Sequence, residues 1–126
     1  NVQVYGDDYD TKDGTGVRDY IHIMDLADAH VKSINYLDEF SGIDIFNLGT
    51  GAGVSVLDMV KAYARVSQRP IPYQIVARRP GDVAQCYASP DHAKTVLGWQ
   101  AVRSLDDMVA SSWRWQSSNP HGYREA

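Results

Sequence analysis

Residues 43–64 read IDIFNLGTGAGVSVLDMVKAYA and contain the clearest structural signal of the chain. The short, mostly apolar run 43–48 predicts a strand, and the alternate glycines that follow it predict a tight turn. Ser55, with Asp58 three residues later, resembles a capping box and predicts that a helix begins there. A strand that turns tightly into a helix is the unit from which α/β folds are built.

The segments on either side repeat this alternation. The expected elements are a polar loop 7–16, a strand 17–23, a helix capped by Asp25, a strand 73–77, a loop 78–85, a helix from Pro90 to a glycine cap at Gly98, and a last helix 106–117. The first of these helices carries Leu26, His30, Val31, Ile34 and Leu37 along one face. We therefore predict an α/β fold in which residues 1–126 form a single domain.

The composition argues against several classes of protein. The chain has 126 residues, of which 44% are hydrophobic and 22% charged, as is typical of a globular domain. The net charge of -4 argues against nucleic-acid binding, and no stretch approaches the roughly 20 apolar residues of a membrane span. Cys86 is the single cysteine, so no internal disulfide is expected, and we expect a cytoplasmic protein. Because the sequence starts at Asn1 without an initiator Met, we expect a fragment of a longer protein.

Two local patterns resemble ligand sites but fit simpler structures better. A strand followed by Gly49-x-Gly51 and a helix is the setting of a dinucleotide fingerprint, but Val54 replaces the third glycine. A tight turn whose free amides point at a helix N-terminus is the simpler interpretation. The acidic loop 7–13 has a lysine at position 12 and lacks the distant Glu of an EF-hand. The histidines show no ligand spacing either, so no metal site is predicted.

Two arginine motifs are candidates for phosphate binding. Residues 78–82, Arg-Arg-Pro-Gly-Asp, place two guanidinium groups on a short loop where they can fork onto phosphate oxygens. The carboxylate of Asp82 can accept hydrogen bonds from vicinal sugar hydroxyls. An exposed turn with a local Arg–Asp pair explains the same spacing, and spacing alone favours it slightly. Arg18-Asp19-Tyr20 is a weaker candidate, for which a half-exposed strand edge is the alternative.

Three tryptophans lie near the C-terminus, at positions 99, 113 and 115. We interpret them as core and helix-packing residues rather than as an aromatic platform for a sugar.

Several strings of the sequence, taken in order, carry a resemblance to a known family. They are residues 14–22 (GTGVRDYIH), 24–27 (MDLA), 47–49 (NLG), 78–82 (RRPGD), 113–116 (WRWQ) and 119–123 (NPHGY). Together they resemble the final third of the UDP-glucose 4-epimerases, which are extended short-chain dehydrogenases/reductases with a Rossmann-type fold. The resemblance covers essentially the whole chain and implies that it is the C-terminal, substrate-binding part of such a fold.

The resemblance implies a redox-neutral reaction of galactose metabolism. UDP-galactose and UDP-glucose interconvert through a 4-keto intermediate while bound NAD takes up and returns a hydride. The NAD-binding domain and the catalytic Tyr-x-x-x-Lys pair are implied to lie upstream. No tyrosine of this chain is followed by lysine at the fourth position, so we expect no catalytic and no cofactor-binding residue here. The chain alone is therefore expected to be inactive.

The resemblance also assigns residues to the UDP part of the substrate. The segment Gln3-Val4-Tyr5 matches a strand whose backbone meets uracil, and Val56 matches an apolar contact to the same base. Arg18 and Arg79 match two arginines that bind the pyrophosphate.

The remaining assignments concern the two sugars. Asp82 matches a carboxylate that binds the ribose, and Tyr20 adds a phenol beside the arginine of its motif. Cys86 matches a position where a bulky Tyr lies against the sugar's C2 substituent in some members, so the smaller thiol implies that UDP-GalNAc and UDP-GlcNAc are accepted too. Pro80 departs from the family, which often has Glu there, and is expected to stiffen the loop.

Two other functions remain open. The chain can be a non-catalytic UDP-sugar-binding module, or part of another UDP-sugar epimerase or decarboxylase. A homodimer is implied for the full-length enzyme, but dimerisation by this piece is doubtful because the family pairs through its NAD-binding domain.

Overall fold

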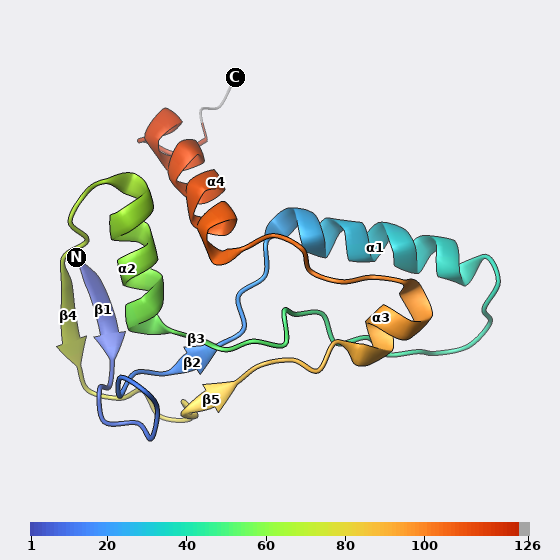
Figure 1. Ribbon diagram of the computed structural model, residues 1–126, viewed down its shortest axis with the longest axis horizontal. Coiled ribbons are helices and arrows are strands. Elements are labelled where there is room, and N and C mark those ends of the chain that lie inside the picture. The colour runs from blue at the N-terminus through green and yellow to red at the C-terminus, as the bar shows by residue number, and fades with distance from the viewer. Residues whose placement is uncertain (124–126) are drawn as a thin grey trace.

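The computed structural model of the protein describes residues 1–123 and has the alternation of strands and helices that the sequence predicts (Figure 1). The elements are β1 (Val2–Tyr5), β2 (Val17–Arg18), α1 (Ile23–Leu37), β3 (Val54–Ser55), α2 (Val56–Ser67), β4 (Tyr73–Val76), β5 (Gln85–Cys86), α3 (Asp91–Leu97) and α4 (Leu105–Ser118). None of the helices among these residues is long and apolar enough to cross a membrane.

The strands form two small sheets near one end of the molecule. In the first, β1 and β4 are parallel, with Val2 opposite Tyr73 and Tyr5 opposite Val76. In the second, β2 lies between antiparallel β3 and parallel β5. Helix α2 lies beside the first sheet and packs against α4, whereas α1 and α3 lie together at the other end (Figure 1).

The buried side chains form two small groups. Val4, Val60 and Val109 are almost fully buried around β1, α2 and α4. A second cluster joins α1 to α3, where Ala29, Ala93 and Trp99 have no exposed surface. The indole nitrogen of Trp99 donates to the carbonyl oxygen of Asp25 at 2.9 Å, which confirms the interpretation of this tryptophan as a core residue.

Several helix ends confirm the local sequence signals. Ser55 caps α2 by accepting from the Asp58 amide at 3.0 Å. The complete reciprocal box occurs instead at α4, between Ser104 and Asp107. Gly98 ends α3 in the left-handed conformation with φ +58°, as the glycine predicts.

Three predictions about secondary structure were wrong. Helix α1 begins at Ile23, because the ring Nδ1 of His22 caps it by accepting from the Met24 amide at 3.0 Å. The strand predicted over 17–23 is therefore paired only at Val17 and Arg18. Residues 43–48 are not a strand, because no other described residue pairs with them.

Candidate functional site

A hollow of about 250 Å³ lies where β1, β2, the start of α2 and the loop before β5 meet. It contains seven of the nine residues predicted to bind substrate. The lining residues are Gln3, Tyr5, Tyr9, Gly16, Arg18, Tyr20, Val56, Arg79 and Asp82. These side chains are up to 79 positions apart in the sequence, since Gln3 and Asp82 both belong to the lining.

The pairing of β1 determines which of its side chains reach the hollow. Successive residues of a strand point to opposite faces. Val4 is 1% exposed and belongs to the core, whereas its neighbours Gln3 and Tyr5 line the hollow. The hydroxyl of Tyr5 donates to Oε1 of Gln3 at 2.7 Å, which links these two side chains. Val4 can therefore contact a ligand in this hollow only through its backbone.

The charged side chains of the hollow are arranged around one carboxylate. Asp82 accepts from Nε of Arg79 at 3.0 Å and lies 3.9 Å from Nη2 of Arg18. The guanidinium of Arg79 also lies over the ring of Tyr5, 4.5 Å from its centroid. The Asp82 carboxylate raises the pKa of Arg79 above its ordinary value, so this guanidinium stays charged. The local Arg–Asp pair that spacing alone favoured is thus present, and it lies inside the hollow.

Tyr9 and Tyr20 add two phenols that differ in their surroundings. Tyr20 is half-buried, and burial raises the pKa of its hydroxyl although Arg18 opposes the shift. Tyr9 is 7% exposed and its hydroxyl has no hydrogen-bond partner among the described residues. The guanidinium of Arg78 covers the Tyr9 ring at 3.9 Å from the centroid. Tyr9 was missed in the sequence because it lies in a polar loop without a local motif.

Cys86 lies next to the hollow but does not line it. It stands opposite Arg18 in the pairing of β2 with β5, and its side chain is exposed. The resemblance-based role of Cys86 in a sugar pocket therefore stays a prediction.

The glycine turn at 49–53 binds a carboxylate of the chain itself. Asp19 accepts from the amide of Thr50 at 3.0 Å, the amide of Gly51 at 3.1 Å and the amide of Ala88 at 3.2 Å. Burial opposes the ionisation of Asp19, but these hydrogen bonds outweigh it and hold its pKa below the usual range. A Cβ on Gly49 would lie 2.3 Å from Asp19 Oδ2, so this glycine permits the close approach. Since Asp19 occupies these amides, the turn does not fit a dinucleotide pyrophosphate.

The acidic loop is likewise structural. Asp13 accepts from the hydroxyl of Thr15 at 2.7 Å and from that of Ser55 at 2.5 Å, which connects the loop to the start of α2. Residues 1–123 contain no group of three or more side chains suited to holding a metal ion.

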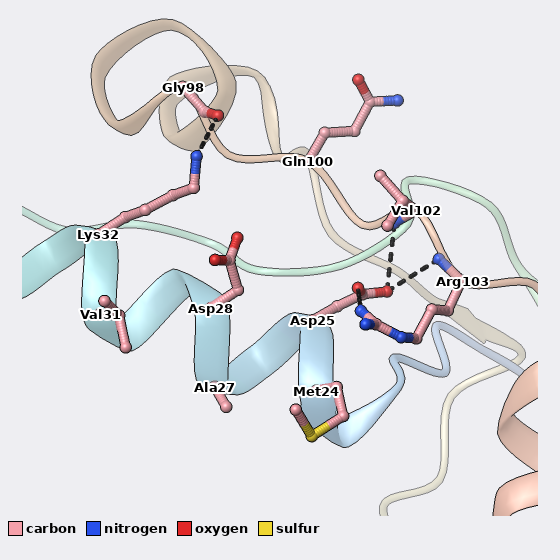
Figure 2. A pocket seen from close by; sticks show the side chains of 10 residues that line it. All are labelled: Met24, Asp25, Ala27, Asp28, Val31, Lys32, Gly98, Gln100, Val102 and Arg103. Carbon is pink, nitrogen blue, oxygen red and sulfur yellow. Dashed lines mark hydrogen bonds and ion pairs between the residues drawn. The ribbon is translucent and has the colours of Figure 1, made fainter.

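A larger groove, of about 600 Å³, lies between α1 and residues 98–103 (Figure 2). Its charged centre is Asp25, which accepts from the amides of Val102 and Arg103 at 3.2 and 3.0 Å and from the Arg103 guanidinium. Lys32 donates to the carbonyl of Gly98 at 2.8 Å. The groove's two cationic side chains are thus engaged, while the carboxylate of Asp28 stays unpaired among residues 1–123 and would repel an anion. We therefore consider the smaller hollow the better candidate for an anionic ligand.

Comparison with known proteins agrees with the resemblance found in the sequence. The sequence model of the family described as GDP-mannose 4,6 dehydratase matches residues 1–112. The chain is 57% identical over 125 residues to the UDP-glucose 4-epimerase of Bacillus subtilis (strain 168), which is 99% of this chain and 37% of that protein. It is 55% identical over 122 residues to the UDP-glucose 4-epimerase of Homo sapiens, or 97% and 35% of the two chains.

A solved structure extends the likeness to the fold. The UDP-glucose 4-epimerase from Bifidobacterium longum, crystallised with NAD+ and UDP, matches with a TM-score of 0.92 and 57% identity, over 96% of this chain and 36% of that one. The predicted fold class is thus confirmed. The chain spans little more than a third of the length of these relatives.

Proposed function

Because the chain belongs to the family described as GDP-mannose 4,6 dehydratase, we propose that it is the UDP-sugar-binding portion of a UDP-glucose 4-epimerase. The whole enzyme would interconvert UDP-galactose and UDP-glucose. The observation that carries this proposal is the hollow, which gathers two guanidinium groups, one carboxylate and an apolar side chain from three distant segments. Its chemistry matches a nucleoside diphosphate, which offers phosphate oxygens, vicinal hydroxyls and a flat base.

In this proposal the residues divide by the part of UDP that they contact. Arg18 and Arg79 bind the diphosphate, and Asp82 accepts from the ribose hydroxyls. Val56 lies against the uracil, and it also borders an apolar pocket between α2 and α4. The β1 backbone at Gln3 and Tyr5 gives the base its polar contacts.

The redox chemistry belongs to other parts of the enzyme. NAD would supply the hydride acceptor for the sugar's C4, but the glycine turn of this chain does not fit it, since Asp19 occupies the turn's amides. The proposal therefore places NAD and the catalytic tyrosine and lysine outside residues 1–126. A cytoplasmic location is an expectation from the composition of the sequence, and a homodimer of the full-length enzyme rests on the resemblance alone.

Turnover measurements test the proposal. The full-length protein with NAD should convert UDP-galactose to UDP-glucose, and the chain of 126 residues alone should not. The sample of the short chain has to be prepared from a host without its own epimerase. No turnover by the full-length protein, together with retained UDP binding, would instead identify a non-catalytic UDP-sugar-binding module. Turnover of a different UDP-sugar alone would identify another epimerase or decarboxylase.

A further inference from the structure

The carboxylate of Asp82 interacts with both arginines that the proposed function assigns to the diphosphate. Its two oxygens face Nε and Nη2 of Arg79 at 3.0 and 3.4 Å, and Oδ1 lies 3.9 Å from Nη2 of Arg18. The Asp82 side chain is 22% exposed, compared with 60% for Arg79 and 32% for Arg18. One negative group therefore partly neutralises the two positive groups of the hollow.

In this arrangement the Asp82 carboxylate and a ligand phosphate compete for the same arginines. Asp82 engages one edge of the Arg79 fork, so a phosphate has to displace the carboxylate or share the guanidinium with it. In the second case two negative groups lie close together and repel each other. A ligand that carries only phosphate groups gains contacts with the arginines. The competition with Asp82, however, lowers its affinity.

A ligand that also carries a vicinal diol avoids that loss. Two hydroxyls give the carboxylate new hydrogen-bond donors, so Asp82 can leave the arginines without becoming an unpaired charge. Arg79 keeps a second contact meanwhile, because its guanidinium lies over the ring of Tyr5.

We propose that Asp82 is a specificity-determining residue that makes diphosphate binding depend on a vicinal diol. It occupies the phosphate-binding arginines when no ligand is bound and releases them to a ribonucleoside diphosphate. Inorganic pyrophosphate and a 2′-deoxynucleotide are thereby disfavoured. This inference rests on the proposed function, because it takes the hollow to be the diphosphate site.

A second ion pair of the same loop provides a matched control. Arg78 pairs with Asp8, with Nε 2.6 Å from Oδ1, and stacks on Tyr9 as Arg79 stacks on Tyr5. The side chain of Asp8 is 71% exposed, and neither Arg78 nor Asp8 lines the hollow. Asp8→Asn therefore removes the same charge from the neighbouring arginine without changing the proposed site.

The test is calorimetric titration of the full-length protein with inorganic pyrophosphate, UDP and 2′-deoxy-UDP. Asp82→Asn should bind pyrophosphate about three- to tenfold more tightly, since an exposed ion pair contributes up to about fivefold and Asp82 forms two. The same variant should gain nothing for UDP, because it loses the ribose contact. The preference for UDP over pyrophosphate should thus fall by at least about three- to tenfold. The preference for UDP over 2′-deoxy-UDP should nearly vanish. Asp8→Asn should change each affinity less than twofold.

Two results would overturn the inference. One is pyrophosphate binding by Asp82→Asn that is unchanged or weaker, which would mean that Asp82 only positions Arg79. The other is an equal gain in pyrophosphate affinity in Asp8→Asn, which would mean that the change in net charge alone causes the effect. A failure of the proposed function looks different: the unsubstituted protein would not bind UDP, or Arg79→Ala would leave the affinities for UDP and pyrophosphate unchanged.

Discussion

Asp25 and Asp82 each face an arginine, but they lie in opposite physical settings. Asp25 has a side chain that is 3% exposed, and it accepts from two backbone amides as well as from Arg103. Asp82 is 22% exposed and its carboxylate pairs with the side chains of Arg79 and Arg18. Backbone amides cannot move away without unfolding the segment, whereas arginine side chains can turn to a ligand.

This difference in partners distinguishes a structural contact, at Asp25, from a contact that a ligand can replace, at Asp82. Burial opposes the ionisation of Asp25, but the hydrogen bonds from Arg103 and Val102 outweigh it, and its pKa lies below the usual range. This carboxylate joins α1 to the segment before α4 (Figure 2). The Trp99 indole donates to the backbone carbonyl of the same residue. We infer that the pair around Asp25 stabilises the fold and that the pair around Asp82 serves binding.

The largest expected effect is on stability at Asp25. Asp25→Ala should lower the free energy of unfolding by about 2–4 kcal/mol, because it leaves an arginine and two backbone amides without their charged acceptor. Urea unfolding followed by tryptophan fluorescence measures this, since the fully buried Trp99 is bonded to Asp25. The remaining folded protein should bind UDP normally.

Asp28→Ala is the matched control for Asp25. Asp28 lies on the same helix and lines the same groove, but its side chain forms no hydrogen bond or ion pair with another described residue (Figure 2). Its replacement should change the free energy of unfolding by less than about 0.5 kcal/mol. Equal losses from the two substitutions would contradict the structural role of Asp25.

The next largest effect is on UDP affinity rather than on stability. Arg79→Ala should weaken UDP binding by about 1.5–3 kcal/mol in the full-length protein, the range for charge-assisted hydrogen bonds, and Arg18→Ala should do the same. Arg79→Lys should restore only part of the loss, because an ammonium cannot fork onto two oxygens. Calorimetry measures the affinity, and the free energy of unfolding should stay within about 0.5 kcal/mol.

Arg78→Ala is the control for Arg79, since the neighbouring guanidinium pairs with Asp8 outside the hollow. It should leave the affinity for UDP nearly unchanged. If both Arg79→Ala and Arg18→Ala kept the full affinity, the assignment of the hollow to the diphosphate would be wrong.

The smallest expected effect concerns Cys86, which lies next to the hollow. Cys86→Tyr should lower kcat/KM for UDP-GalNAc and UDP-GlcNAc by about ten- to a hundredfold, because overfilling a packed site costs about 1–3 kcal/mol. The pair without the acetamido group should lose far less. Steady-state kinetics on both pairs measures the difference, and equal losses would place Cys86 outside the sugar pocket.

Local signals predicted the helix ends of this chain well. Ser55 and Gly98 act through hydrogen bonds and backbone angles within a few residues, so their roles could be recognised from neighbours in the sequence. The same local reasoning was wrong at Asp25. The sequence could not show that His22 caps the helix and that Asp25 faces a segment 77 and 78 residues away.

The sequence by itself determined the α/β alternation, the loop that carries the two arginines and the resemblance to the epimerases. Only the tertiary structure decided that Gln3, Arg18, Val56 and Arg79 line one hollow, because their proximity depends on strand pairing and helix packing across the whole chain. It also decided that residues 43–48 are no strand, since a strand needs a hydrogen-bonded neighbour that no local pattern supplies.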